Sequence, residues 1–249
     1  MTEYREELSP IVGYDGQILF GNAAERKAAE WLAVLTRRKF SVEFSPPSSI
    51  GIAFRLAPDR FAEIASFMAM NRNGLQIMFH PRTERGRNEE ALICTYYGRP
   101  RAAKLVENPN RPVSWHFHIY FPSAEIAKAH WLHDAIARRF RVAIYPVEDG
   151  AGGPHPMPNL EVQVGWDELP KILPWLALNR QGLSVHVHPR SEDLIGDHLV
   201  WPLWLGTPVR LIEAELDGLR PPGADEGLEH VNGAPREPPS PDKRFPPTA

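Results

Sequence analysis

The two halves of this 249-residue chain repeat one another, and this repeat restricts the possible folds more than any other feature. The segment NRNGLQIMFHPR at 71–82 matches NRQGLSVHVHPR at 179–190, and the offset of 108 residues continues downstream from YYGRP to WLGTP. Upstream, WLAVLTRRKFSV at 31–42 matches WLHDAIARRFRV at 131–142 at an offset of 100. Two diverged copies of one small domain of about 100 residues account for this pattern.

The second copy has a clear order of expected elements. Alternating aromatic and β-branched residues predict strands, and good helix formers with a 3.6-residue period predict helices, with Ser123 and Asp167 as N-caps. The order β-α-β-β-α-β is the ferredoxin-like motif, in which the first strand lies between the third and fourth. The predicted fold class is therefore α+β, with two tandem ferredoxin-like (βαββαβ) domains and antiparallel sheets. The expected elements are strand 115–121, helix 124–139, strand 140–145, strand 160–164, helix 167–179 and strand 183–189.

Proline is concentrated at the C-terminus. Eight of the 26 prolines fall in the last 29 residues, which are poor in aliphatic side chains, so this stretch cannot bury enough apolar surface to offset its ordering entropy. The segment LVENPNRPV, between the two copies, has the composition of a linker. The expected organisation is a degenerate domain at 1–104, a linker at 105–113, a domain with the functional site at 114–217 and a disordered tail at 218–249.

Composition excludes several classes of protein. A net charge of −3 gives no electrostatic reason to expect a nucleic-acid partner, and no run of 18 apolar residues predicts a membrane span. The start MTEYREELSP lacks the basic segment and the apolar segment that are typical of a secretory signal. The single cysteine, Cys94, rules out a disulfide within the chain and a cysteine-based zinc site. A cytoplasmic location is the expectation.

Histidines gather on one face of the second predicted sheet. Side chains alternate between the two faces of a strand, so Phe117 would face the helices, and the histidines of two H-x-H pairs would face the helix-free side. Imidazole suits Zn, Cu, Fe and Ni, and a carboxylate beside two histidines suits Fe(II). The sequence leaves open which three groups bind a metal. The candidates are His116, His118, His188 and Glu161, with His186 as a neighbour and His155 and His198 approaching from loops.

These pieces resemble the DOPA 4,5-dioxygenase family. The resemblance covers 114–208 and rests on HFHIYF, GPHP, LNRQGLSVHVHP and DH followed by WLG, in that order. It implies a ferredoxin-like protein that uses non-haem Fe(II) and O2 to open the ring of a catechol such as DOPA beside its hydroxyls. The site residues that the resemblance implies are His116, His118, His155, His188 and His198.

Roles for the other candidates follow from their chemistry. An uncoordinated histidine can take and return a catechol proton, and His155 or His198 is expected to do so. Candidate substrate-binding residues are Tyr120, His186, Arg190 and Trp204, and Trp115 and Trp201 could also wall the aromatic ring. The expected partners are a small aromatic diol and O2. Two alternatives remain open: a metal- or ligand-binding module without turnover, and another metal-assisted enzyme such as a zinc-dependent hydrolase, since zinc could occupy the isolated protein.

The first copy lacks most of these histidines. Asp15, Gln17, Met78 and Glu90 stand where the second copy has His116, His118, His186 and His198, and only His80 matches a histidine, His188. The N-terminal copy is therefore expected to keep the fold without the site. A tandem chain of this kind would mimic a dimer of single domains, so an intramolecular pseudo-dimer is expected.

Overall fold

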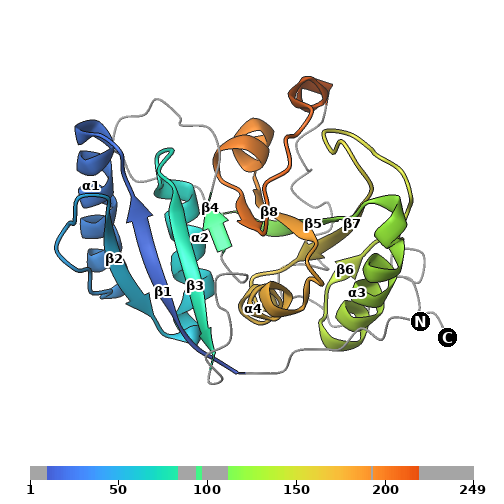
Figure 1. The fold of residues 1–249 in the computed structure, drawn as a ribbon, viewed down its shortest axis with the longest axis horizontal. Helices are drawn as coiled ribbons and strands as arrows, with labels where there is room; N and C mark the ends of the chain where they lie inside the picture. The colour runs from blue at the N-terminus through green and yellow to red at the C-terminus, as the bar shows by residue number, and fades with distance from the viewer. Residues whose placement is uncertain (1–9, 84–93, 97–111, 192, 219–249) are drawn as a thin grey trace.

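A computed structural model describes residues 10–83, 94–96, 112–191 and 193–218. Helices and antiparallel strands alternate along the chain, which confirms the α+β class (Figure 1). The expected tail lies outside the described residues except for Gly218, and the expected linker lies outside them except for Pro112 and Val113. No helix in the described part of the chain is long and apolar enough to cross a membrane.

The N-terminal half begins with a long strand and a capped helix. The side chain of Asn22 accepts a hydrogen bond from the backbone of Glu25 at 2.9 Å and starts the first helix, whose last turn is basic. The elements of this half are β1 (Ile11–Leu19), α1 (Ala23–Phe40), β2 (Gly51–Leu56), η1 (Pro58–Arg60), α2 (Phe61–Asn71), β3 (Ile77–Thr83) and β4 (Cys94–Tyr96).

The C-terminal half repeats this order with differences at the element ends. Ser123 lies in a short 3₁₀ turn, and Asp167 precedes the N-cap of the next helix and pairs with Arg141 at 3.0 Å, so neither is the N-cap that the sequence predicts. The elements are β5 (Ser114–Tyr120), η3 (Ser123–Glu125), α3 (Ile126–Arg139), β6 (Ala143–Ile144), β7 (Asn159–Val164), α4 (Leu169–Asn179), β8 (Ser184–Arg190), the π-helix η4 (Gly196–Val200), β9 (Leu203–Leu205) and η5 (Glu213–Gly218).

The described strands form one sheet rather than two. Their order is β2-β1-β3-β4-β9-β8-β5-β7-β6, so β5 lies between β7 and β8 as the motif predicts. The expectation of separate sheets is wrong, because the short strands β4 and β9 pair with each other and join the two halves. An unpaired sheet edge is a template for another strand, and here each half covers the edge of the other.

The junction has a symmetric register. Thr95 pairs with Trp204, and Tyr96 pairs with Leu203. The repeat offset of 108 equates Thr95 with Leu203 and Tyr96 with Trp204, so each pair maps onto the other when the copies are exchanged. A self-complementary contact of this kind is typical of two-fold dimers.

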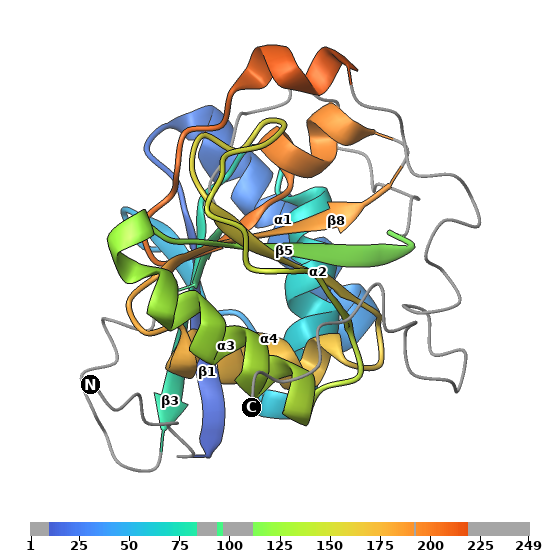
Figure 2. The ribbon, with the colours of Figure 1, turned by 90° about the vertical axis from the view of Figure 1, so that its right-hand side faces the viewer.

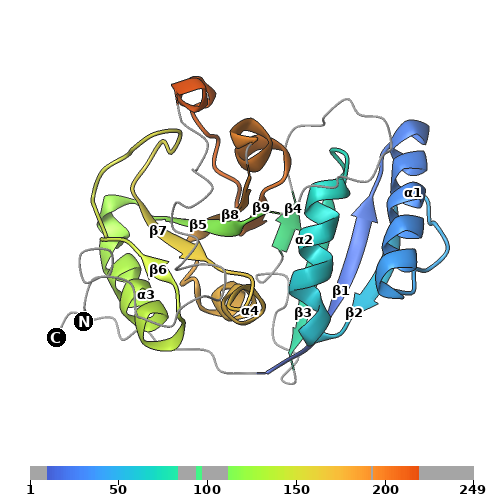
Figure 3. The ribbon, with the colours of Figure 1, turned by 180° about the vertical axis from the view of Figure 1, so that it is seen from behind.

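The helices leave one face of the C-terminal strands to other segments. Figure 3 shows α1 and α2 in front of β1–β3, while α3 and α4 lie along one side of β5 and β7. In Figure 2, η4 and η5 lie on the opposite side of β8 from α3 and α4. Both faces are buried there: Phe117 is 0% exposed on the helix side, and His118 and His186 are 4% and 0% exposed on the other.

The most strongly repeated motif forms a turn at a helix end. Asn73 and Gly74 have φ of 52° and 82°, and Gln181 and Gly182 have 53° and 82°, which is the left-handed conformation that ends many helices. In both copies the preceding arginine donates to the carbonyl of the following leucine at 2.7 Å. The NR-x-GL repeat is therefore a structural feature of each half.

Candidate metal centre and active site

The register of β5 against β8 assembles the histidine face. His116 lies opposite His188, and His118 lies opposite His186, as the alternation predicts. Two overlapping triads result, with ring nitrogens within 4.8 Å of one another in each. One consists of His116, His118 and His188, and the other of His118, His155 and His198.

His118 is oriented by an asparagine at the start of β7. Its Nδ1 lies 3.0 Å from Oδ1 of Asn159, while Nδ2 of Asn159 faces the carbonyl of Met157 at 3.5 Å. Because an amide oxygen only accepts, Nδ1 of His118 carries the proton and its Nε2 keeps a lone pair. A hydrogen bond that fixes the tautomer in this way is the usual second partner of a metal-binding histidine.

His188 is held in the same tautomer. Its Nδ1 donates to the carbonyl of Pro189 at 2.7 Å, so its Nε2 also carries a lone pair. The Nε2 atoms of His118 and His188 lie 3.3 Å apart. Two lone pairs that face each other repel unless a cation lies between them, and metal–nitrogen bonds of about 2.0–2.1 Å at a tetrahedral angle separate two nitrogens by about 3.3–3.4 Å. The pair therefore fits one metal ion.

His198 reaches the cluster from the π-helix. Its Nδ1 donates to the carbonyl of Leu194 at 2.9 Å, and its ring centre lies 4.0 Å from that of His188. The carboxylate of Asp197 accepts bonds from the backbone and hydroxyl of Ser191 at 2.7 and 2.8 Å, which ties the π-helix to the end of β8. π-Helical turns are rare and frequent at functional sites.

His155 comes from the long loop before β7. Its ring centre lies 3.8 Å from that of His118, and its Nδ1 lies 2.6 Å from the hydroxyl of Tyr120. Gly153, with φ of 54°, allows the tight turn that directs His155 toward the sheet. The GPHP segment thus brings a loop histidine over the strands.

Glu161 belongs to neither triad. Its Oε1 lies 3.3 Å from Nε2 of His116, and that side chain of His116 is 16% exposed. Arg190 donates to Gln163 at 3.3 Å on the same face. Glu161 is thus placed as a partner of His116, and its role as a metal ligand stays a prediction.

Burial sets the protonation of the cluster. Desolvation lowers the pKa of His116, His118, His186, His188 and His198, and it lowers that of His155 to about 3. Burial also raises the pKa of Glu161, against the effect of Arg190, and that of Tyr120. At neutral pH the histidines are therefore uncharged, which is the form that binds metals.

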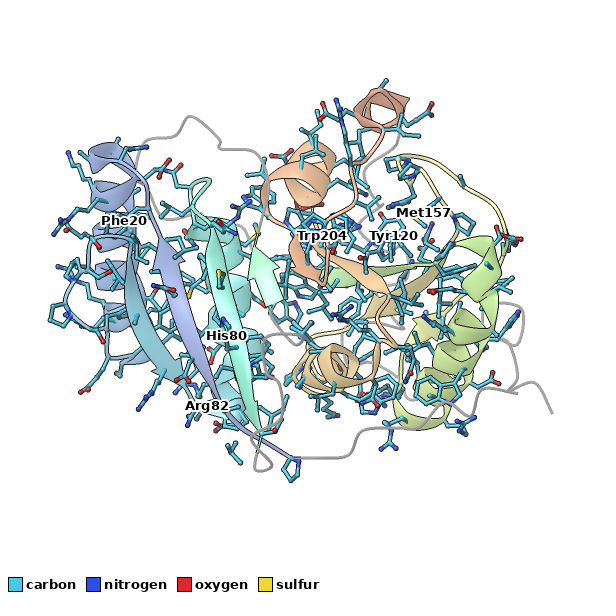
Figure 4. All side chains as sticks on the ribbon, in the orientation of Figure 1. Phe20, His80, Arg82, Tyr120, Met157 and Trp204 are labelled. Carbon is cyan, nitrogen blue, oxygen red and sulfur yellow. The ribbon has the colours of Figure 1, made fainter. Side chains whose placement is uncertain are left out.

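Aromatic side chains line one side of the cluster. The rings of Tyr120 and Trp204 are stacked with centres 5.9 Å apart, and His186 lies 4.5 Å from Trp204. Figure 4 shows Tyr120 and Trp204 close together, with Met157 nearby. Two other tryptophans lie away from this side of the cluster: Trp115 packs on Trp166 in the main core, and Trp201 packs with Met70 and Val200. The expectation that these two line the site of an aromatic substrate ring is therefore wrong.

The N-terminal half carries ion pairs at the equivalent positions. Asp15 lies 3.0 Å from Arg55 and 3.5 Å from Arg82, and His80 is half-buried on β3 (Figure 4). In the described part of this half, no three potential ligands come together as they do in the other. Glu90 lies outside the described residues.

Sequence reasoning missed one residue of the site. Asn159 precedes the predicted strand and was not a candidate, although its side chain fixes the tautomer of His118. A polar residue that enters a strand beside a histidine pair is the signal that could have found it.

Comparisons with known proteins match the half that carries the histidines. Residues 115–214 match the Dopa 4,5-dioxygenase family. A DOPA 4,5-dioxygenase from Amanita muscaria is 33% identical over 111 residues, which cover 41% of this chain and 49% of that protein. An uncharacterised 21.2 kDa protein from Botryotinia fuckeliana is 32% identical over 106 residues, which cover 39% and 57%. The chain thus spans about half the length of the curated relatives that it matches.

One solved structure is similar to about the same share of this chain. It is a protein from Nostoc punctiforme whose provisional description is a dioxygenase, with 35% identity and a TM-score of 0.42. The match covers 43% of this chain and 92% of that one.

Proposed function

Because residues 115–214 match the Dopa 4,5-dioxygenase family, we propose that this protein is a non-haem Fe(II)-dependent extradiol dioxygenase, which opens the ring of a catechol such as DOPA with O2. The observation that carries the proposal is the pair of uncharged imidazoles of His118 and His188, whose Nε2 lone pairs face each other at 3.3 Å. Such a pair on a buried face, beside further histidines and an aromatic wall, suits a metal with open positions for a small ligand.

In this proposal His116, His118 and His188 hold the metal, and Glu161 either joins them or orients His116 through their 3.3 Å contact. Bound iron would supply Lewis acidity and redox chemistry toward O2. Asn159 and the Pro189 carbonyl keep His118 and His188 in the required tautomer.

His198 and His155 move the protons. Nε2 of His198 is free to accept, because its Nδ1 proton is held by the carbonyl of Leu194. Nδ1 of His155 accepts a hydrogen bond from the hydroxyl of Tyr120 at 2.6 Å. Burial lowers the pKa of both histidines, so each is an uncharged base before substrate binds.

The remaining candidates bind the substrate. Tyr120, Trp204 and His186 provide flat faces for an aromatic ring, and Arg190 offers a positive charge at the edge of the same face. Leu211, in contact with Tyr120 and Trp204, excludes water from that side.

The proposal extends to the architecture. The two halves are tandem ferredoxin-like copies, of which the N-terminal one keeps the fold and has lost the site. The strand order on either side of the β4–β9 junction and the equal NR-x-GL turns support this interpretation.

One observation favours a second candidate function. Both triads consist of histidine alone, which is also a ligand set of catalytic zinc. A zinc-dependent hydrolase is therefore the alternative.

The test is reconstitution of metal-free protein with Fe(II) or Zn(II) under anaerobic conditions, followed by addition of DOPA or a simple catechol and then air. We expect oxygen uptake and a yellow ring-opened product with iron only. Oxygen uptake by neither form would refute the dioxygenase, and hydrolysis of ester substrates by the zinc form would support the alternative.

A further inference from the structure

The N-terminal half reaches the candidate site through one arginine at the end of α2. Arg72 is 1% exposed, and its Nη1 donates to the carbonyl of Leu75 at 2.7 Å within the turn described above. Its Nη2 donates to the carbonyl of Val200, 128 residues away in the other half. The counterpart in the second copy, Arg180, makes the same bond within its own turn and is only half-buried.

An apolar contact accompanies this hydrogen bond. Met70, two residues before Arg72, packs with Val200 and Trp201 in a small buried cluster separate from the main core. Two kinds of contact from α2 thus meet at the same segment of the C-terminal half.

That segment carries His198. Val200 is the last residue of the π-helix, and Trp201 closes it by donating to the carbonyl of Gly196 at 2.9 Å. The π-helix is tied to its own half at Asp197 through Ser191 and to the other half at Val200 through Arg72. His198 lies between these two attachments, and its carbonyl lies 3.3 Å from Nε2 of His186.

We propose that Arg72 is a positioning residue for His198, so that the N-terminal copy, which lacks the histidine site, completes the site of the C-terminal copy. A guanidinium donates to two carbonyls in fixed directions, so Arg72 links the end of α2 to the end of the π-helix with a defined geometry. Without that link the end of the π-helix loses its hydrogen bond to the N-terminal half and keeps only the apolar contact with Met70 from that half, and His198 moves away from His188. The catalytic consequence rests on the proposed function, whereas the effect on His198 does not.

The experiment compares Arg72→Met with Arg180→Met. Methionine keeps an unbranched apolar stem and removes the guanidinium donors, and the Arg180 variant loses the equivalent turn bond without touching Val200. The first readout is the rate at which diethyl pyrocarbonate modifies His198 in metal-free protein, followed by peptide mass spectrometry with the exposed His130 as internal reference.

In the wild type we expect His198, which is 7% exposed, to react far more slowly than His130. In Arg72→Met we expect the rate at His198 to rise about tenfold or more through local opening, with no change at His118 and His188. Arg180→Met should leave His198 protected. An unchanged rate at His198 in Arg72→Met would overturn the proposal.

The second readout separates the two proposals. If the iron-loaded wild type turns over catechol, we expect Arg72→Met to keep its iron and its KM and to lose about 100-fold in kcat, as for a displaced acid–base residue. A wild type without activity would refute the dioxygenase but leave the modification result in force. If Arg72→Met does not fold, Met70→Ala tests the same contact from its apolar side with the same expected exposure of His198.

Discussion

The histidines of the candidate site differ in what lies behind each ring, and this decides which nitrogen faces the cluster. His118, His188 and His198 each give the Nδ1 proton to an oxygen of the protein, so their Nε2 atoms face one another. His186 instead directs Nε2 at the carbonyl of His198. His186 is therefore a neighbour of the triads and not a metal ligand, which agrees with its proposed contact with the substrate.

The first prediction concerns the two central ligands. We expect His118→Ala or His188→Ala to abolish stoichiometric binding of Fe(II) or Co(II), because each removes one of the two facing Nε2 atoms. Both side chains point away from the helix-packed core, so far-ultraviolet circular dichroism should stay that of the wild type. His80→Ala, at the equivalent position of the N-terminal copy, is the control and should bind metal normally. Normal metal content in His118→Ala would rule out the triad of His116, His118 and His188.

The second prediction concerns the tautomer of His118. Asn159→Ala removes the acceptor of its Nδ1 proton and should weaken metal binding about 10–100-fold, the usual effect of losing such a partner. Asn159→Asp keeps an acceptor and should retain most of the affinity, as measured by competition with a chromophoric chelator. Equal losses in both variants would show that the hydrogen bond has no such role.

The third prediction is a loss of stability in acid. Burial lowers the pKa of six clustered histidines in the folded chain, whereas the unfolded chain has an ordinary pKa of about 6.5. Below that pH the unfolded state binds more protons, so the free energy of unfolding falls as pH falls. Burial raises the pKa of Asp197 to about 7 and also raises the pKa of Glu161, and these two carboxyl groups act in the opposite direction to the six histidines.

We therefore expect the Tm of the metal-free protein to fall from pH 7.5 to pH 5.5, measured by calorimetry. A Tm that stays constant or rises as the pH is lowered would contradict the burial of the histidines in the structure.

At the scale of single elements, the π-helix depends on a glycine. A Cβ on Gly196 would lie 2.7 Å from the ring of Trp201 and 2.8 Å from Cγ of Asp193. We expect Gly196→Ala to cost about 1–3 kcal/mol through overpacking and to lower kcat through displacement of His198. Gly150→Ala, where a Cβ meets nothing within 4 Å, is the control. Thermal unfolding and turnover of both variants measure the effect, and a Gly196→Ala protein as stable and active as the control would contradict this account.

The elements that carry the site were the easiest to predict from the sequence. The alternation of His116, Phe117 and His118 gave the face of each side chain, and the structure confirms the pairing with β8. The strand expected at 140–145 is reduced to Ala143–Ile144, since Phe140 packs against Trp175 instead of extending it. The three-residue strands β4 and β9 and the π-helix could not be predicted, because they depend on contacts between the halves and carry no periodic pattern of their own.

At the scale of the whole molecule, the continuous sheet makes each half the partner of the other. The strand β9, which carries Trp204, is covered on its outer edge by β4. Because the register at this junction is self-complementary, β9 of an isolated C-terminal half could pair with β9 of a second molecule.

We expect a chain of residues 112–249 to elute as a dimer in size-exclusion chromatography with light scattering and to show increased modification of His198, because Arg72 is absent. The full-length chain is the control. A stable monomer with a protected His198 would show that the N-terminal half is needed neither to cover the edge of β9 nor to position His198.

The covalent join between the halves has a consequence for how the protein responds to dilution. In an assembly of separate subunits, the strand pairing at β4 and β9 and the bond from Arg72 to Val200 would be lost when the concentration fell below the dissociation constant. Here both contacts are intramolecular, and the tether keeps the effective concentration of one half near the other in the millimolar range, of the order known for short linkers. The geometry of the histidine site should therefore not change when the protein is diluted.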